Sequence, residues 1–394
     1  MDKSARLDYI FYEMTKILQI SNYYPPDIGG IEIIAKAVSD ALRDCCELRV
    51  LCFSHEKTGR TDEVGGVTVT RCGTQLKVSS QQLSARMPFL LRRILREYAP
   101  DAVILHMPNP FLAFLTLRLL PRGTKLVTYW HSDIVRQKKG ERIFRRMFLR
   151  VLERSAAIVA TSPDYIRGSL YLRQYSEKCV MIPNCIDEDR LRLDEESEAF
   201  AKALREKYPG KILLAGLGQQ VGYKGFPHLV RALRLLDDRF VLFLVGRPGD
   251  ATPEILREAE GMENVILTGM LPDRERNGYL SACDIFCFPS VTKNEAFGVA
   301  LAEALYCGKP AVTFTIPGSG VNYVNLNGVT GIEVPNRDEA ACADALRTLA
   351  DDPALRKKYG TGAARRAREL FLFSHFSREI RALIGSVCGE EPPL

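Results

Sequence analysis

Short apolar segments alternate with amphipathic segments along almost the whole chain, and this alternation restricts the possible folds more than any other feature of the sequence. Apolar residues recur at helical spacing in segment 31–44, for example, which lies between two apolar segments. Such alternation is typical of α/β proteins, in which helices cover both faces of a parallel sheet. The predicted strands are 16–21, 47–54, 67–72, 101–107, 125–132, 156–162, 178–184, 211–218, 240–246, 264–270, 284–290 and 310–316.

These strands are too many for one open sheet of ordinary size. A charged stretch without strand character, 187–209, interrupts the series. We therefore predict two Rossmann-like domains, 1–186 and 187–369, followed by a terminal helix and tail over 370–394. In open parallel sheets, ligands bind beyond the carboxyl ends of the strands, so the cleft between two facing domains is the expected site.

The composition is that of an ordinary globular chain, with 46% hydrophobic and 26% charged residues. A formal net charge of +6 is mild, and we expect no nucleic-acid partner. The 11 cysteines include no CxxC pair, which favours free thiols in a reducing compartment. We see neither a signal peptide nor an apolar stretch of ~18 residues, and we therefore expect a cytoplasmic protein.

Two glycine-containing loops follow predicted strands. Gly29-Gly30 precedes the predicted helix at 31–44, and it is either a phosphate-binding helix N-terminus or a plain tight turn. The second loop, 215–225, has glycines one residue too far apart for the dinucleotide fingerprint. It carries Lys224 just before a glycine, where a lysine can neutralise a phosphate; the alternative is a solvated surface lysine.

Charged and polar residues follow other predicted strands. His131 and Asp133 end one strand, and a histidine there can donate a hydrogen bond or transfer a proton. His106 is a weaker candidate at another strand end. Glu295 and Glu303 lie in an apolar setting, where a carboxylate is costly unless it is paired. A helix predicted from about Phe297 to Tyr306 presents its N-terminus between them, an arrangement that suits a nucleotide sugar.

The stretch "NEAFGVALAEALYCGKPAV" resembles the E-x7-E motif of the retaining GT-B glycosyltransferases of family 4. "YYPPDIGGIE", "YKGF", "NVILTGMLPDRE", "YLSACDIFCFPS" and "GVTGIEVP" resemble further segments of that family, in the same order and over nearly the whole chain. The resemblance implies an acceptor-binding domain followed by a nucleotide-sugar-binding domain, with the C-terminal helix returning to the first. It also implies glycosyl transfer with retention and without a metal or other cofactor.

The resemblance also implies a role for individual residues. Catalysis would rest on His131 near the donor sugar, Lys224 at the departing diphosphate and Glu295 on the sugar hydroxyls. Glu303 would accept the ribose hydroxyls, and the Leu271 backbone with Asp273 would lie against the base. The remaining donor-binding positions are Gly29, Gly30, Gln219 and the backbone amides of Phe297, Gly298 and Val299.

One position departs from the family pattern. Gln219 stands where the family usually has an arginine, and a neutral side chain cannot form a charge-assisted pair with a phosphate. Either another cation compensates, such as Arg247, or diphosphate binding is weaker. Gln219 thus favours one alternative, a catalytically impaired subunit. A second alternative is a non-hydrolysing nucleotide-sugar epimerase, and a third is a nicotinamide-dependent oxidoreductase, against which the glycine spacing argues. The acidic run at 187–189 resembles a metal-binding DxD but lies in the charged connector, and we interpret it as solvated.

Two basic amphipathic segments, 84–100 and 136–155, bear on the acceptor. Such segments can lie on an anionic membrane, and the alternative is a surface helix whose apolar face is buried. Their presence in one predicted domain favours a lipid-linked saccharide acceptor and peripheral contact with the inner face of the cytoplasmic membrane. "HSDIVRQK" resembles mannosyltransferases of polysaccharide assembly, which makes GDP-mannose the expected donor.

Overall fold

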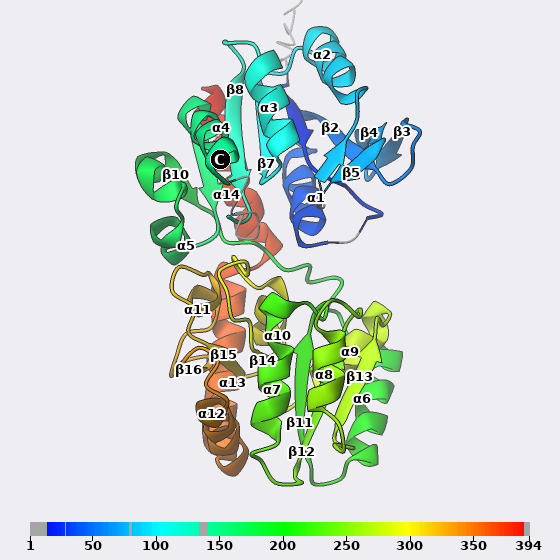
Figure 1. Cartoon of the computed structure of the whole chain (residues 1–394), viewed down its shortest axis with the longest axis vertical. Helices are drawn as coiled ribbons and strands as arrows, with labels where there is room; N and C mark the ends of the chain where they lie inside the picture. The colour runs from blue at the N-terminus through cyan, green and yellow to red at the C-terminus, as the bar shows by residue number, and fades with distance from the viewer. Residues whose placement is uncertain (1–13, 28, 79–80, 134–140, 390–394) are drawn as a thin grey trace, which may run out of the picture. The chain divides into compact units, whose positions relative to one another are not determined.

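The structure is a computed structural model that describes residues 14–27, 29–78, 81–133 and 141–389 (Figure 1). An eight-stranded sheet has the strand order β10-β9-β8-β7-β1-β2-β4-β3, and a six-stranded sheet has the order β13-β12-β11-β14-β15-β16. The pairings described within the six-stranded sheet are all parallel. The fold is therefore the α/β, GT-B-type arrangement of two Rossmann-like sheets expected from the sequence.

The element bounds are as follows. The strands are β1 Lys16–Ile20, β2 Glu47–Ser54, β3 Arg60–Val64, β4 Val67–Gly73, β5 Leu76–Val78, β6 Gln81–Leu83, β7 Ala102–Met107, β8 Lys125–Trp130, β9 Ala157–Ala160, β10 Cys179–Met181, β11 Ile212–Leu217, β12 Phe240–Val245, β13 Val265–Gly269, β14 Ile285–Phe288, β15 Ala311–Phe314 and β16 Gly331–Val334. The α-helices are α1 Gly30–Leu42, α2 Met87–Glu97, α3 Pro110–Leu119, α4 Glu141–Arg154, α5 Pro163–Gly168, α6 Glu195–Lys207, α7 Phe226–Leu233, α8 Thr252–Glu258, α9 Asp273–Ala282, α10 Val299–Tyr306, α11 Val321–Val324, α12 Glu339–Asp351, α13 Pro353–Leu370 and α14 Phe373–Cys388, and the 3-10 helices are η1 Leu172–Lys178 and η2 Gly222–Lys224.

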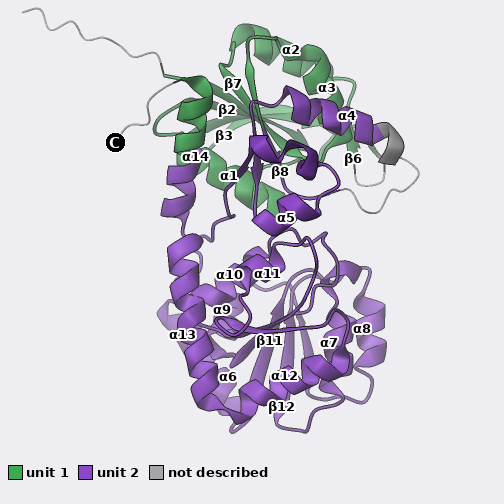
Figure 2. Ribbon diagram, turned by 90° about the vertical axis from the view of Figure 1, so that its left-hand side faces the viewer, with its two compact units in different colours: residues 1–127, 381–394 green, residues 128–380 purple. Residues whose placement is uncertain are grey.

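The chain divides into two compact units, one formed by residues 1–127 and 381–394 and the other by residues 128–380 (Figure 2). Helix α14 contributes to the first unit, where Arg381 Nε donates to the carbonyl of Ala41 at 2.6 Å. This contact confirms that the terminal helix returns to the N-terminal part of the chain. The predicted domain limits 1–186, 187–369 and 370–394 stay predictions.

The six-stranded sheet is buried on both faces, which explains why its strands are continuous apolar runs. In β11, Leu213, Ala215 and Leu217 belong to a core shared with α6, α10 and α13. Leu214 belongs to the opposite core, which includes residues of α7 and α12. Alternate side chains of a strand point to opposite faces, so one strand contributes side chains to both cores. The loops that follow the carboxyl ends of such strands are free of this packing and can carry site residues.

The structure corrects several details of the prediction. Helix α10 begins at Val299, because Gly298 before it has a left-handed φ of +95°. The terminal helical segment is preceded by α13, which was not predicted. Strand β16 and the short strands β3, β5 and β6 were also not predicted.

The two basic amphipathic segments form helices α2 and α4, although 136–140 lies outside the described residues. Met87, Leu91 and Leu95 of α2 are buried, and so are Phe148 and Val151 of α4, whereas Phe89 of α2 is 75% exposed. The apolar faces are thus largely used in packing, as the alternative expected. Membrane contact stays a prediction, and within the described ranges no helix combines the length and apolar character needed to cross a bilayer.

Candidate active site

A lysine and a glutamate meet at the carboxyl edge of the six-stranded sheet. Lys224 lies in η2 after β11, and Glu295 lies in the loop after β14. The Lys224 ammonium donates to the Glu295 carboxylate, and Ser290 Oγ donates to the same carboxylate oxygen at 3.2 Å. β11 and β14 are paired neighbours, so their carboxyl ends bring these two loops together.

The Lys224–Glu295 pair is strongly sheltered from solvent, since the two side chains are 14% and 12% exposed. Burial acts to lower the pKa of Lys224, but the negative charge and hydrogen bond of Glu295 outweigh it and hold the pKa above its usual value. The ammonium also lies 4.8 Å from the centre of the Phe288 ring. Lys224 is therefore a cation at neutral pH, at the strand edge where ligands of such sheets bind.

Gly225 explains why a glycine follows the lysine. Its φ of +67° is left-handed, and a Cβ at this position would come within 2.0 Å of the Pro289 carbonyl oxygen. Only glycine allows the loop after β11 to pack so closely on the end of β14. This backbone contact places Lys224 beside the loop that carries Glu295.

Helix α10 begins next to Glu295. Gly298 is its N-cap residue, and the amide of Val299, the first helical residue, has no carbonyl partner within the helix, whereas that of Leu301 donates to the Gly298 carbonyl at 3.0 Å. The Phe297 side chain is buried and packs edge-on against Phe371, with ring centres 5.4 Å apart. Phe297 therefore anchors the turn in the core, and an amide-rich helix end with a positive dipole lies beside the Lys224–Glu295 pair.

Glu303 has a different set of partners. It lies inside α10, where Arg276 of α9 donates to its carboxylate and Arg190 lies 3.8 Å away. Burial raises the pKa of the Glu303 carboxyl, and the two guanidinium groups oppose this increase. Arg190 also binds Asp273 at 2.5 Å, which lowers the pKa of Asp273. Asp273 and Glu303 therefore belong to one network of alternating charge.

His131 and Asp133 follow β8. The His131 ring stacks on Tyr129, with centres 4.6 Å apart and planes 17° apart. The buried Asp133 carboxylate accepts hydrogen bonds from Trp130 Nε1 at 3.0 Å and Ser169 Oγ at 2.7 Å. It also accepts one from Lys293 Nζ at 3.0 Å. Since Lys293 is two residues before Glu295, this ion pair connects the segment that carries His131 and Asp133 to the loop that carries Glu295.

Two sequence families match the chain. Residues 197–366 match the family described as "Glycosyl transferases group 1", and residues 28–190 match "Glycosyltransferase Family 4". The chain is also 30% identical over 356 residues to the O-antigen chain mannosyltransferase C of Escherichia coli, covering 90% of this chain and 93% of the relative. The chain belongs to the family 4 glycosyltransferases.

Two further comparisons agree with this assignment. The glycosyltransferase is 31% identical to the D-rhamnosyltransferase WbpZ of Pseudomonas aeruginosa, covering 89% of this chain and 90% of the relative. Its fold is similar to that of the sucrose-phosphate synthase from Thermosynechococcus elongatus, with a TM-score of 0.79 at 18% identity, covering 95% of this chain and 99% of that one. The structural likeness supports the fold alone, whereas the sequence relatives establish the family.

Other predicted donor-binding residues of the glycosyltransferase lie on loops at the same edge of the sheet. Gln219 is exposed, next to the buried Gln220, whose backbone N–H donates to the carbonyl of Arg247 at 2.9 Å. The loops of Gln219 and Arg247 are therefore neighbours, and compensation by Arg247 stays a prediction. Leu271 lies between β13 and α9, two residues before Asp273, and packs partly against the core.

Gly29 and Gly30 lie in the other unit of the glycosyltransferase. Gly29 is the N-cap residue of α1 and Gly30 is its first residue, so the helix begins one residue earlier than predicted. A Cβ at Gly30 would meet nothing within 4 Å, whereas a Cβ at Gly29 would come within 2.2 Å of the Glu32 carboxylate. A role for Gly29 and Gly30 at the diphosphate stays a prediction.

The sequence reasoning missed Arg190, Arg276 and Lys293. Arg276 lies one turn after Asp273 in α9, and this spacing could have indicated that both lie on one helix face. Lys293 lies two residues before Glu295 in the same loop. Arg190 lies in the charged connector, whose sequence pattern does not distinguish it from its neighbours. In the structure, its backbone N–H donates to Asp187 Oδ1 at 3.0 Å. The backbone N–H of Phe373 donates to the Glu188 carboxylate at 3.2 Å.

Proposed function

We propose that this glycosyltransferase moves a hexose, with retention and without a metal, from a nucleotide sugar to a saccharide or lipid-linked saccharide acceptor. We further propose GDP-mannose as the donor and cell-surface polysaccharide assembly as the setting. The O-antigen chain mannosyltransferase C and the D-rhamnosyltransferase WbpZ are similar over nearly their whole lengths, which supports a hexose donor and a polysaccharide product.

The observation that carries this proposal is the buried Lys224–Glu295 pair beside the N-terminus of α10. Departure of a nucleoside diphosphate develops negative charge, and a fixed cation together with helix amides stabilises that charge without reorganisation. Glu295 is an acceptor for sugar hydroxyls once Lys224 shares its hydrogen bonds with the diphosphate. Glu303, fixed by Arg276, presents acceptor oxygens to ribose hydroxyls farther along α10.

The reaction requires the bond between the anomeric carbon and the diphosphate oxygen to break while an acceptor hydroxyl attacks from the same face. An oxocarbenium-like centre forms between the two events. The attacking hydroxyl gives its proton to an oxygen of the diphosphate, which departs from the same face. Lys224 and the α10 amides lower the basicity of the diphosphate and so favour its departure.

A donor panel tests the proposal. The full chain is incubated with GDP-mannose, UDP-glucose, UDP-N-acetylglucosamine, UDP-galactose or NAD in the presence of EDTA, and thermal stabilisation and donor turnover are measured. We expect GDP-mannose to stabilise the protein and to be consumed, with an α-linked product by NMR. Stabilisation by NAD alone, turnover that requires a divalent metal, or inversion at the anomeric carbon would each contradict one part of the proposal.

Gln219 favours one second candidate, a catalytically impaired subunit. The side chain is exposed and neutral at a position where the family usually has an arginine. Under this alternative no nucleotide sugar would raise the melting temperature or be turned over. The substitution Gln219→Arg would then restore donor binding, whereas in an active enzyme it would only strengthen it.

A further inference from the structure

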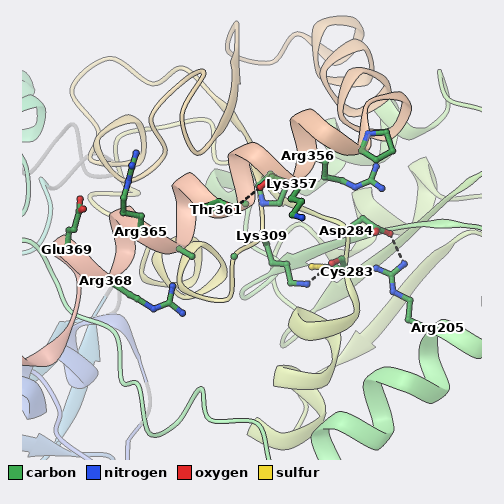
Figure 3. Close-up of a pocket in the computed structure, with 15 residues that line it drawn as sticks. Arg205, Cys283, Asp284, Lys309, Arg356, Lys357, Thr361, Arg365, Arg368 and Glu369 are labelled. Atoms are coloured by element: carbon green, nitrogen blue, oxygen red, sulfur yellow. Dashed lines mark hydrogen bonds and ion pairs between the residues drawn. The ribbon is translucent and has the colours of Figure 1, made fainter.

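A basic pocket of about 800 Å³ lies between α13 and the loops that precede β14 and β15 (Figure 3). This volume falls within the range of small-molecule sites, roughly 300–1,000 Å³. Gly308, Lys309 and Pro310 form one wall, and Cys283 and Asp284 lie next to them. The opposite wall is α13. The cationic side chains that line the pocket are those of Arg205, Lys309, Arg356, Lys357, Arg365 and Arg368.

The charge of this pocket is poorly compensated. Six cationic side chains line it against two carboxylates, those of Asp284 and Glu369, which leaves an excess of four positive charges. Asp284 is already bound to Arg205 at 2.8 Å. Lys309 Nζ donates to the carbonyl oxygens of Ser281 and Cys283 at 2.7 and 2.9 Å, and these neutral acceptors leave its charge in place.

Two cations of α13 are available to a ligand. Lys357 and Arg368 are exposed, and neither has a carboxylate partner among the residues that the structure describes. They are eleven residues apart, or close to three full helical turns, so they lie on one face of α13. The Arg368 guanidinium lies 5.0 Å from the centre of the Tyr306 ring, which holds it beside the pocket without using its hydrogen-bond donors.

The wall formed by α13 is fixed in place. A Cβ at Gly360 would come within 2.4 Å of the carbonyl oxygen of Gly308, so the helix backbone packs directly on the loop before β15. Such close backbone packing leaves little freedom for the helix to shift. The pocket therefore exists before any ligand binds, which reduces the entropic cost of binding.

The pocket is separate from the candidate active site. Asp284 immediately precedes β14 and Pro310 immediately precedes β15, so the pocket lies at the amino ends of these strands. Lys224 and Glu295 lie beyond the carboxyl ends of β11 and β14. In a parallel sheet these are opposite edges, and the basic pocket is not a subsite for the donor.

We propose that this pocket binds a phosphate-bearing anion at a second site, remote from the donor. Phosphate suits the pocket because the arginine fork binds two phosphate oxygens at once and lysine adds a compact charge. A ligand with two phosphate groups matches the four excess charges better than a single carboxylate does. The phosphates can belong to one soluble diphosphate or to neighbouring headgroups of an anionic lipid, since the recognising groups are the same.

Isothermal titration calorimetry with inorganic pyrophosphate tests the soluble form. The full chain carries Lys224→Ala, which removes the diphosphate contact at the donor site. We expect Lys357→Ser with Arg368→Ser to raise the Kd for pyrophosphate about tenfold or more, because charged hydrogen bonds are lost. If the Lys224→Ala chain does not fold, the titration is done with Lys224 intact. Two classes of pyrophosphate site should then appear, and the Lys357→Ser, Arg368→Ser substitutions should weaken only one of them.

The matched control replaces Lys358 and Arg257 by serine. Lys358 is adjacent to Lys357 and exposed but does not line the pocket, and Arg257 is exposed on α8. This control removes the same total charge, so its Kd for pyrophosphate should stay within about twofold of the parent, as expected when exposed charges are screened. An equal loss in both double variants would overturn the proposal, because it would indicate general charge attraction.

Flotation with vesicles of phosphatidylglycerol and phosphatidylcholine tests the lipid form. Loss of vesicle binding in the Lys357→Ser, Arg368→Ser chain, with the control retained, assigns the phosphate to a lipid headgroup. Pocket-dependent binding of pyrophosphate alone assigns it to a soluble ligand. The proposal fails if neither pyrophosphate nor the vesicles respond to the pocket variant. Donor turnover should be unchanged in both double variants. A parent chain that turns over no donor would contradict the proposed function, whatever the pocket variants do.

Discussion

Among the residues that the structure describes, the two glutamates of the E-x7-E motif differ in the number of cationic partners that hold them. Glu295 has one cationic partner, Lys224, whereas Glu303 has two guanidinium groups around it. A single lysine with rotatable donors can share its hydrogen bonds with an arriving diphosphate. Arg276 and Arg190 instead hold the Glu303 carboxylate in one position, which suits the recognition of a ligand. The sequence predicted both glutamates as site residues, but it did not predict Arg276 or Arg190, because ion pairs between distant helices have no local pattern.

Replacement of Lys224 by alanine should abolish most of the activity. Glu295 would be left buried without its charged partner, and the departing diphosphate would lose its cation. We expect kcat to fall by about 10²–10³, as for other removed charge-stabilising donors. Loss of one member of a buried pair also costs about 3–5 kcal/mol of stability. Donor turnover per folded molecule and urea denaturation measure the two effects.

Lys211→Ala is the matched control for this substitution. Lys211 immediately precedes β11, at the opposite end from Lys224, and pairs with the exposed Asp238 at 3.2 Å. An exposed pair contributes little, so the stability should change by less than about 1 kcal/mol and kcat should stay the same. Equal activities of the two variants would show that Lys224 has no role in the reaction.

The affinity for the donor should depend on pH through Glu303. Burial raises the pKa of this carboxyl above its ordinary value of 4.5, so it takes up a proton at a higher pH than an exposed glutamate does. A protonated Glu303 loses acceptor capacity for ribose hydroxyls. The donor KM should therefore rise as the pH falls, beginning above 4.5. In Glu303→Gln this acid limb should be absent, and its persistence in that variant would assign the titration to another group.

At the scale of elements, the site is built from loops at strand ends that are tied to one another by short contacts. Thr161, just after β9, donates to the Ala296 carbonyl at 3.2 Å, and Lys293 binds Asp133 after β8. Lys293 also donates to the Gly168 carbonyl at the end of α5, at 3.2 Å. These contacts fix the loop that carries Glu295 relative to the segment that carries His131.

The Asp133–Lys293 pair should therefore act on donor use as a unit. We expect Asp133→Asn and Lys293→Gln each to raise the donor KM, and the double variant to be less impaired than the sum of the two. The coupling should be about 0.5–3 kcal/mol, as for residues in direct contact. A double-mutant cycle on kcat/KM measures it. Strict additivity would show that the two residues act independently.

The sequence predicted the buried strands well because their signal is local. Segment 47–54 was predicted as a strand and is β2, Glu47–Ser54. Strand β3 was missed because its sequence, RTDEV, is polar and mostly exposed at the sheet edge. The start of α10 was placed two residues early, because Phe297 is apolar and the left-handed conformation of Gly298 is not visible in a hydrophobic pattern. Edge strands and helix starts thus depend on three-dimensional context that periodicity does not contain.

For the molecule as a whole, none of the 11 cysteines forms a disulfide. Burial raises the pKa of Cys52 to about 12 and that of Cys283 to about 11. The reactive species is the thiolate, so both thiols should be inert in the folded chain. A thiol reagent at pH 8 should therefore modify fewer cysteines in the native protein than in urea. A urea midpoint that falls on addition of a reductant would reveal a disulfide and contradict the prediction.

The division of the chain into units has a consequence for its synthesis. The first unit consists of residues 1–127 and 381–394, so residues 128–380 are translated between its two parts. The hydrogen bond from the Arg381 guanidinium to the carbonyl of Ala41 can form only after the whole of the other unit has been made. The unit whose translation begins first is thus completed only after residue 381 and those that follow it have been made.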